Sequence, residues 1–319
     1  MLINCSAAQG ETGTDYEAVK MLQDIAREFK ELERYDFRVL QAVETGMRFF
    51  DWVPVDDLPN YARLPRDEVE YRITRLSKYK LVERKTGHYV GYKLTFGGYD
   101  ALAINTLVRR TAIESLGSKV GVGKESDIYD AEREGGRIVI VKFHREGTTF
   151  RHVKRSRGYF GKAERCSWML ASRLAAEREY EAITTLYGNV AVPRPIAHNR
   201  HVIVMGLVDG REISSTTLGD PIAILDKIIA QIKLTYQLGI VHADLSEYNV
   251  VVCADGDIAL IDWPQWVSVA HPNADELLYR DVSTVLSYFA RKYQIAKRTE
   301  DVLAYVKQRD HGPAERFAG

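Results

Sequence analysis

The sequence is poor in cysteine, has no net charge and lacks a long apolar segment. Its three cysteines, Cys5, Cys166 and Cys253, are scattered, odd in number and without metal-ligand spacing, which argues against a disulfide framework and for a reducing compartment. No uncharged apolar run is long enough to cross a membrane. The N-terminus has neither the basic start nor the apolar stretch of a signal peptide. We therefore expect a cytoplasmic protein without a membrane partner, in which residues 1–14 form a flexible tail.

Charge is balanced overall but uneven along the chain. The 44 Lys and Arg residues equal the 44 Asp and Glu residues, so a surface for nucleic acid has to come from a local patch. Acidic side chains outnumber basic ones from Glu11 to Asp57, and basic ones dominate from Tyr61 to Leu94 and from Phe143 to Cys166. The 319 residues, 45% of them hydrophobic, suffice for two globular domains.

The first hundred residues carry the pattern of a winged-helix domain, which we place at residues 15–108. Apolar residues recur at helical spacing before Phe50, and a short helix is expected near Val55–Tyr61. A longer helix begins at Pro65, a residue suited to a first helical turn. The segment "LVERKTGHYVGYKLT" then alternates like a β-hairpin with its turn at Thr86-Gly87.

Basic residues on the longer helix and on the hairpin favour a contact with nucleic acid. We expect the helix to turn its cations outwards into a groove and the hairpin to lie along phosphates. The candidate residues are Arg66, Arg72, Arg75, Lys78, Arg84 and Lys85. A protein–protein module, or a helix with an ordinary solvated face, stays open as the alternative.

After Arg110 the order of motifs matches a protein-kinase N-lobe at about 115–208, followed by a C-lobe at about 209–310, within a second domain at residues 109–319. Small residues in "VGVGKESDIYDA" let backbone N–H groups approach phosphate oxygens. Gly121, Gly123 and Lys124 are the candidates of this loop, although a plain structural hairpin would share its glycines. No helix follows the loop, so it is neither a Walker loop nor a Rossmann turn. Gly135-Gly136 then turns the chain into "RIVIVKF", which carries Lys142.

Lys142 lies between apolar neighbours, and a lysine that turns inwards needs a carboxylate partner. The helical run "SWMLASRLAAEREYEAITTLY" offers Glu177, Glu179 and Glu181. Glu179 is favoured because it shares the buried side of that helix with Leu186.

The segment "VAVPRPIAHNRHVIVMGLVDG" predicts two strands that lead to a hinge. Met205 is expected behind an adenine pocket. Backbone groups of Gly206 and Val208 are expected at the adenine edge.

Two short motifs carry the predicted chemistry. In "IVHADLSEYNVVV", Asp244 is expected to be the carboxylate beside the attacking hydroxyl, and Asn249 is expected to be a metal ligand. In "ALIDWPQ", Asp262 is expected to hold the metal that bridges the phosphates. Taken alone, His242, Asp244 and Asn249 could be loop-capping residues. Their order after Lys142 favours phosphoryl transfer.

The motifs "GVGKESDIYDA", "HADLSEYN" and "LIDWPQWVSVAHPNADELLYRDV" resemble the RIO atypical kinases, and the N-terminal winged helix resembles their second branch, found in archaea and eukaryotes. Ala243 stands where that family has glycine, and Gly206 where a hinge glutamate is common. Asp-Trp-Pro replaces the Asp-Phe-Gly of ordinary protein kinases and no Ala-Pro-Glu follows, so we expect no ordinary peptide-docking surface.

The resemblance implies an α+β fold, with a winged-helix domain before a reduced two-lobed kinase domain. It implies a serine/threonine kinase or ATPase that uses ATP with Mg²⁺, or with Mn²⁺ as a substitute, in maturation of the small ribosomal subunit. The rRNA and ribosomal proteins of the subunit precursor would be its partners, and the free protein would be a monomer. Lys142 would contact ATP, Ser126 phosphate, and Asn249 with Asp262 the metal, with Asp244 as the catalytic residue.

The connection after Lys142, "HREGTTFRHVKRSRGYFGKAERC", is basic and poor in apolar periodicity. We expect it to be mobile until it meets an anionic surface. Its hydroxyls at Thr148, Thr149 and Ser156 are candidates for self-phosphorylation. A merely tolerated insertion is the alternative.

Two other functions stay open at this point. A small-molecule phosphotransferase of the aminoglycoside-kinase type uses a similar catalytic loop, but the winged helix and the two basic patches argue against it. The other alternative is a nucleic-acid-binding regulator with an inactive kinase fold that senses ATP. The complete set of Lys142, Asp244, Asn249 and Asp262 argues against it.

Overall fold

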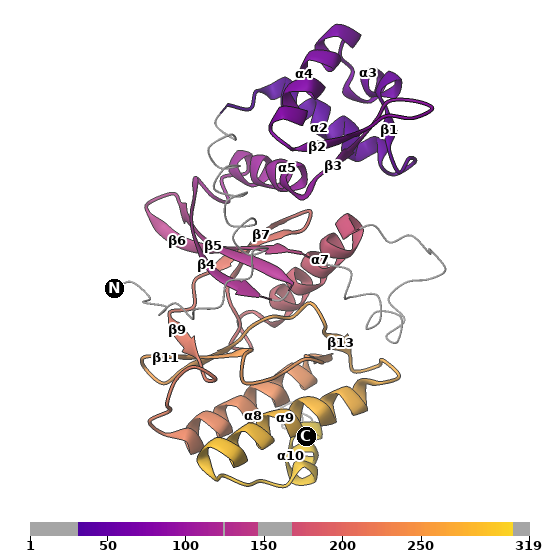
Figure 1. The fold of residues 1–319 in the computed structure, drawn as a ribbon. Coiled ribbons are helices and arrows are strands. Elements are labelled where there is room, and N and C mark those ends of the chain that lie inside the picture. Colours follow the sequence, from indigo (N-terminus) through magenta and orange to yellow (C-terminus); the bar gives the residue numbers. More distant parts are fainter. Residues whose placement is uncertain (1–30, 124, 146–167, 309–319) are drawn as a thin grey trace, which may run out of the picture. The chain divides into compact units, whose positions relative to one another are not determined.

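The computed structural model describes residues 31–123, 125–145 and 168–308. The chain divides into two compact units, residues 1–121 and 122–319, and each is described by itself (Figure 1). The expected N-terminal tail, Lys124 and the candidates Thr148, Thr149 and Ser156 lie outside the described residues. Within the described ranges, no helix combines the length and the apolar character that a membrane crossing requires.

The first unit has the order of elements expected of a winged helix. Its elements are α2 (Arg34–Gly46), β1 (Val53–Pro54), η1 (Val55–Asp57), α3 (Leu58–Ala62), α4 (Arg66–Lys78), β2 (Val82–Lys85), β3 (Gly91–Leu94) and α5 (Phe96–Arg109). The strands form an antiparallel sheet in the order β1-β3-β2. A Cβ atom at Gly98 would lie 2.1 Å from the carbonyl oxygen of Leu81, so only glycine lets α5 start so close to β2. The predicted helices after Pro54 and the predicted hairpin are all present.

The expectation that α4 turns its cations outwards is wrong for Arg72. Its residue is only 8% exposed, and its guanidinium donates to Glu33 at 2.8 Å and to Glu68 at 2.6 Å. A third carboxylate, Asp36, is fully buried 3.5 Å away. Periodicity placed Arg72 on the polar side of α4, but the carboxylates of α2 and of the preceding turn pull this cation into the interior.

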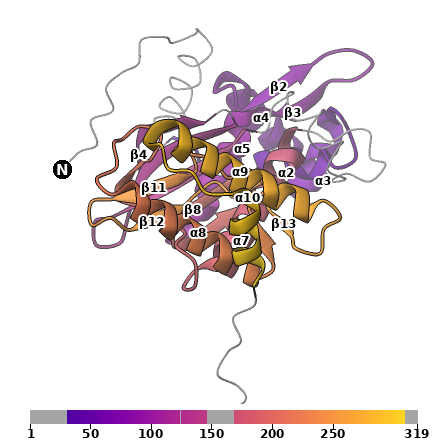
Figure 2. The same ribbon diagram turned by 90° about the horizontal axis from the view of Figure 1, so that it is seen from below.

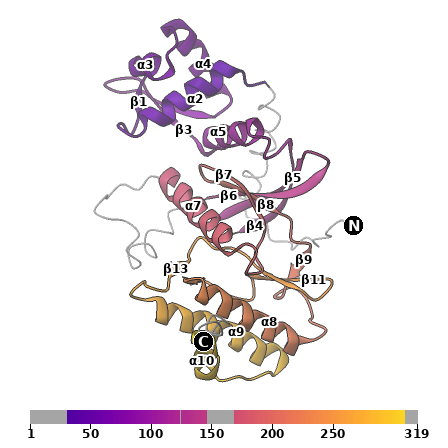
Figure 3. The ribbon, with the colours of Figure 1, turned by 180° about the vertical axis from the view of Figure 1, so that it is seen from behind.

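A five-stranded sheet, whose residues from 122 onwards lie in the second unit, is covered by one helix. The strands are β4 (Ser115–Gly123), β5 (Ser126–Arg133), β6 (Arg137–His144), β7 (Pro195–Asn199) and β8 (Val202–Gly206), in the order β4-β5-β6-β8-β7. Both predicted hairpins, β5–β6 and β7–β8, are present. Helix α7 (Trp168–Leu186) packs on β6, β7 and β8, as Figure 3 shows from behind.

The rest of this unit is mostly helical. It contains β9 (Gly210–Glu212), α8 (Pro221–Gln237), β10 (Ile240–Val241), β11 (Val250–Cys253), β12 (Ile258–Leu260), β13 (Val267–Ser268), α9 (Ala274–Tyr293) and α10 (Thr299–Lys307). Helices α8, α9 and α10 pack on one another (Figure 2). The short strands form a β12-β11-β9 sheet and a β10-β13 pair. The loop between β10 and β11 carries the sequence "HADLSEYN".

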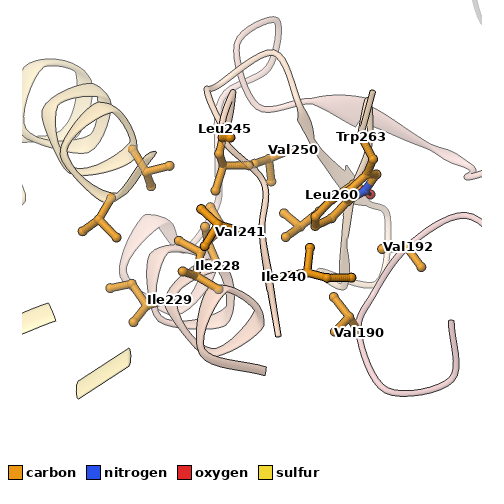
Figure 4. Close-up of a cluster of buried hydrophobic side chains, with 14 of the residues drawn as sticks. Val190, Val192, Ile228, Ile229, Ile240, Val241, Leu245, Val250, Leu260 and Trp263 are labelled. Atoms are coloured by element: carbon orange, nitrogen blue, oxygen red, sulfur yellow. The ribbon is translucent and has the colours of Figure 1, made fainter. Parts of the chain in front are cut away.

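A buried apolar cluster holds both ends of that loop (Figure 4). Side chains of α8 meet those of the segments before and after the loop. Residues from this cluster include Ile228, Ile229, Val241, Leu245, Val250 and Trp263. Trp263 is fully buried, and removing an aromatic side chain of this kind costs about 3–5 kcal/mol. The loop is therefore anchored by packing on each side of its polar residues.

Candidate active site

Lys142 is the centre of an ion-pair cluster that joins three elements. Its Nζ atom lies 2.9 and 2.7 Å from the two carboxylate oxygens of Glu179 on α7. The same atom lies 2.6 Å from Oδ1 of Asp262, just after β12. The partner favoured from the sequence is thus the one the fold provides, whereas Glu177 and Glu181 are exposed.

The electrostatics of this cluster keep Lys142 and Glu179 charged. Burial opposes the charge on Lys142, but the carboxylates of Asp262 and Glu179 outweigh it and raise the lysine pKa above its ordinary value. Burial likewise opposes the charge on Glu179, and the charge of Lys142 together with the His144 contact lowers its pKa to about 2. At neutral pH the site therefore holds a fixed lysine cation beside two carboxylates.

His144 is a member of the cluster that the sequence reasoning missed. It is buried, and its Nε2 atom lies 3.0 Å from Oε2 of Glu179. Burial lowers the pKa of His144, against the opposing effect of Glu179. The signal that could have found it is the strand period of two, since Lys142 and His144 are two residues apart on β6 and so point to the same face.

The predicted catalytic loop is closed by its own asparagine. Nδ2 of Asn249 donates to the backbone carbonyl of Asp244 at 2.8 Å. Asp244 is exposed and Asn249 is buried. This bond uses the amide nitrogen of Asn249, so the oxygen of the same amide is the atom it can offer to a cation.

Helix α9 fixes the backbone on both sides of Asp244. The buried carboxylate of Asp281 accepts hydrogen bonds from the N–H groups of Ala243 at 2.7 Å and Leu245 at 3.0 Å. Arg280 donates to the carbonyl of Ala243. Ala243 has a φ of +66°, a left-handed conformation that glycine adopts freely and that costs other residues about 1 kcal/mol. The α9 contacts hold this conformation and with it the position of Asp244.

His242 has a structural place in the loop. Its Nε2 atom is 3.1 Å from the carbonyl of Ile261, to which it donates, and its ring lies against the buried ring of Trp263 with centroids 4.3 Å apart. This contact links the loop to the strand end that carries Asp262. Of His242, Asp244 and Asn249, it is His242 that therefore fits the role of a loop-capping residue.

Asp262 combines exposure with an uncommon backbone conformation. Its φ is +67°, and its side chain is 44% exposed although one oxygen contacts Lys142. Non-glycine residues in the left-handed conformation persist only where the surrounding structure sustains them. They cluster at functional sites. The amide oxygen of Asn249 and the carboxylate of Asp262 are hard oxygen donors, the kind that Mg²⁺ takes. Among the described residues no group of three or more His, Cys, Asp or Glu side chains is placed to hold a metal ion.

The predicted nucleotide-contact residues lie along the five-stranded sheet. Gly121 and Gly123 are in β4, Ser126 begins β5, and the buried Met205 is near the end of β8. The N–H of Gly206 donates to the carbonyl of Arg194 at 2.8 Å. An adenine contact at Gly206 would therefore use its carbonyl.

Two family models match this chain. The RIO domain model matches residues 127–302. The model described as Rio2, N-terminal, matches residues 29–110. Between them they cover α2 to α5 of the first unit and most of the second unit.

Curated relatives and a solved structure resemble the chain over most of its length. The RIO-type serine/threonine-protein kinase Rio2 of Methanocaldococcus jannaschii is 42% identical, over 80% of this chain and 96% of the relative. The serine/threonine-protein kinase rio2 of Schizosaccharomyces pombe is 37% identical, over 82% of this chain and 78% of the relative. A crystal structure of the Rio2 kinase-ADP/Mg²⁺-phosphoaspartate complex from Chaetomium thermophilum superposes with a TM-score of 0.77 at 35% identity, covering 89% of each chain.

Proposed function

This chain belongs to the RIO-type serine/threonine protein kinases, in the group with the Rio2 N-terminal domain, and on that premise we propose that it transfers the γ-phosphate of ATP during maturation of the small ribosomal subunit. The domains are the winged helix at 15–108 and the kinase domain at 109–319. The protein acts in the cytoplasm, and its partner is the subunit precursor, with rRNA and ribosomal proteins.

The observation that carries the phosphotransfer proposal is the contact of Lys142 with both Glu179 and Asp262, at 2.6 to 2.9 Å. Transfer of a phosphoryl group is mainly a matter of positioning and charge stabilisation. A lysine held by α7 on one side and by the strand end on the other supplies a positioned cation for ATP phosphates.

The other residues divide the remaining tasks. Asp244 accepts the proton of the attacking hydroxyl, since its loop is fixed by Asp281 on both sides. Asn249 and Asp262 would hold Mg²⁺, which would supply neutralisation of the charge on the phosphates. Met205, Gly206 and Val208 contact adenine, while Gly121, Gly123, Lys124 and Ser126 lie at the phosphates.

The acceptor can also be the protein itself. The relative from Chaetomium thermophilum is described with a phosphoaspartate. In this chain an oxygen of Asp262 would attack the γ-phosphorus, the bond between the β- and γ-phosphates would break to release ADP, and water would later cleave the acyl phosphate to inorganic phosphate. This route gives ATP hydrolysis with Asp262 as the transient acceptor.

The test is incubation of the full chain with [γ-³²P]ATP and Mg²⁺, with and without small-subunit precursor particles. Both labelled protein and released phosphate are followed. We expect turnover that requires Asp244 and changes when particles are added. Equal turnover by the wild type and by Asp244→Ala would contradict the assignment. Absence of any particle effect would contradict the ribosomal part.

A further inference from the structure

The cations of α4 are largely committed to carboxylates of the same unit. Arg72 and Arg75 both contact Glu33, at 2.8 and 2.9 Å, and both lie within 3.5 Å of Asp36. Arg66 pairs with Asp56 and Glu70, although at an exposed position. The helix that would enter a groove therefore presents little unneutralised charge, and a nucleic-acid surface has to be sought elsewhere in the unit.

The β2–β3 hairpin has a solvent face that carries two lysines. Successive side chains of a strand point to opposite faces, and the register pairs Glu83 with Lys93 and Lys85 with Gly91. These four residues share the outer face. Arg84 pairs with Tyr92 on the opposite face, where Tyr92 is buried and Arg84 is exposed. The predicted residues Arg84 and Lys85 thus lie on opposite faces, and Lys93 is the other lysine on the face of Lys85.

Two aromatic side chains lie on this same face. The Nζ atoms of Lys85 and Lys93 are 5.7 and 5.9 Å from the ring centroid of Trp52. A Cβ atom at Gly91 would lie 2.9 Å from Cβ of Trp52 and 3.0 Å from the ring of Tyr89, so glycine leaves the space that both side chains occupy. Tyr89 also donates to the carbonyl of Trp52 at 3.1 Å.

We infer that this face of the hairpin, formed by Trp52, Lys85, Tyr89 and Lys93, binds an unpaired RNA strand. The inference rests on the proposed function, and it names the element and the class of RNA that the N-terminal unit contacts. Tyr89 is 49% exposed and offers a ring on which a base can stack. Lys85 and Lys93, whose ammonium groups lie over the Trp52 ring, then contact the phosphates of the strand.

An unpaired strand suits this surface better than a duplex. Base–aromatic stacking needs a base face that is not already covered by its neighbours, as in single strands and loops. The cation–π contacts hold both ammonium groups against Trp52 before any ligand arrives. Glu83 shares the face and Asp51 adjoins Trp52, so the surface has little net charge and its affinity has to come from stacking together with local phosphate contacts.

The test measures binding of the full chain to a fluorescent single-stranded 12-nucleotide RNA and to the same sequence as a duplex. We expect Tyr89→Ala to weaken single-strand binding by about 5- to 100-fold and Tyr89→Phe to retain most of it. The double change Lys85→Gln and Lys93→Gln should reduce the slope of log affinity against log salt by about 1.4, for two phosphate contacts.

The matched control removes two cations from α4, with Arg66→Gln and Lys78→Gln. We expect it to leave single-strand binding nearly unchanged. A larger loss in this control than in the hairpin variants would overturn the inference in favour of α4. Preferential binding of the duplex, or no binding of the single strand by wild type, would also overturn it. Since ATP turnover is measured separately in the same preparations, failure of RNA binding is distinguishable from failure of the phosphotransfer proposal.

Discussion

Nζ of Lys142 lies 2.6 Å from Oδ1 of Asp262, although 120 positions separate the two residues. The lysine thereby neutralises charge on a carboxylate that is also the predicted metal ligand. A cation bound at Asp262 has to share that carboxylate with Lys142. The pair also links β6 to the strand end after β12, the two sides of the proposed nucleotide site.

The variants Asp244→Ala and Asp262→Ala should separate chemistry from binding. Asp244→Ala should lower turnover at least 100-fold and largely spare nucleotide affinity, because a proton acceptor acts on the attacking hydroxyl group and not on the nucleotide. Asp262→Ala should weaken binding of Mg²⁺–ATP as well. Calorimetric titration and phosphate release measure the two effects. Equal loss of nucleotide affinity in both variants would argue against this division of roles.

The variant Asp262→Asn tests the aspartyl-phosphate route. With [γ-³²P]ATP, the wild type should carry a label that hydroxylamine removes, as expected of an acyl phosphate, and the variant should lack it. Asp257→Asn is a suitable control, since Asp257 is an exposed carboxylate that pairs with Lys227. Label that survives in Asp262→Asn would assign the acceptor to another residue.

Glu179→Gln should destabilise the second unit by about 3 kcal/mol, because it removes the charge that Lys142 and His144 share in the interior. Lys142 keeps its contact with Asp262, so the loss of stability should fall at the lower end of the range for a broken buried ion pair. Glu181→Gln, on the exposed side of the same helix, should change stability by less than about 0.5 kcal/mol. Urea unfolding measures both. Similar midpoints for the two variants would show that the buried pair adds no stability.

His144 should make stability fall in mild acid. Burial holds its pKa in the folded state below the unfolded value of 6.5, although Glu179 opposes the shift. The unfolded chain then takes up the proton first, so the contribution is fully present above about pH 6.5 and is lost as the pH falls below it. Urea unfolding at pH 7.5 and pH 5.5 should show a smaller difference in His144→Gln than in wild type, and His88→Gln, at an exposed position, should behave like wild type. An unchanged pH dependence in His144→Gln would assign the acid sensitivity to other groups.

Arg72→Gln should destabilise the first unit by about 2 kcal/mol, because it leaves the buried Asp36 and the partly buried Glu68 with fewer donors. Arg66→Gln removes a cation whose side chain is 64% exposed, and it should cost less than about 0.5 kcal/mol. Thermal unfolding followed by circular dichroism compares the two. If both variants unfold at the same temperature, the ion pairs of Arg72 add no more stability than an exposed ion pair does.

Local patterns predicted much of the candidate site. The spacing in "HADLSEYN" and "LIDWPQ" pointed to Asp244, Asn249 and Asp262 as a set, which stays a prediction, and helical periodicity singled out Glu179, the carboxylate that Lys142 contacts, from three candidates. Such features are readable because each depends on a short stretch with a regular period. The hairpins and the winged-helix order of the first unit were predictable for the same reason.

The sequence by itself determined the order of the elements, the family pattern and the candidate side chains for the chemistry. Only the tertiary structure decided that Arg72 is internal, that His144 shares Glu179 with Lys142, and that Asp281 holds the loop of Asp244. These contacts join residues far apart in the chain, and a buried charge or backbone N–H group is matched by whichever partner the packing brings near. Periodicity tells which face of an element is polar, but it does not tell which polar group another element places opposite.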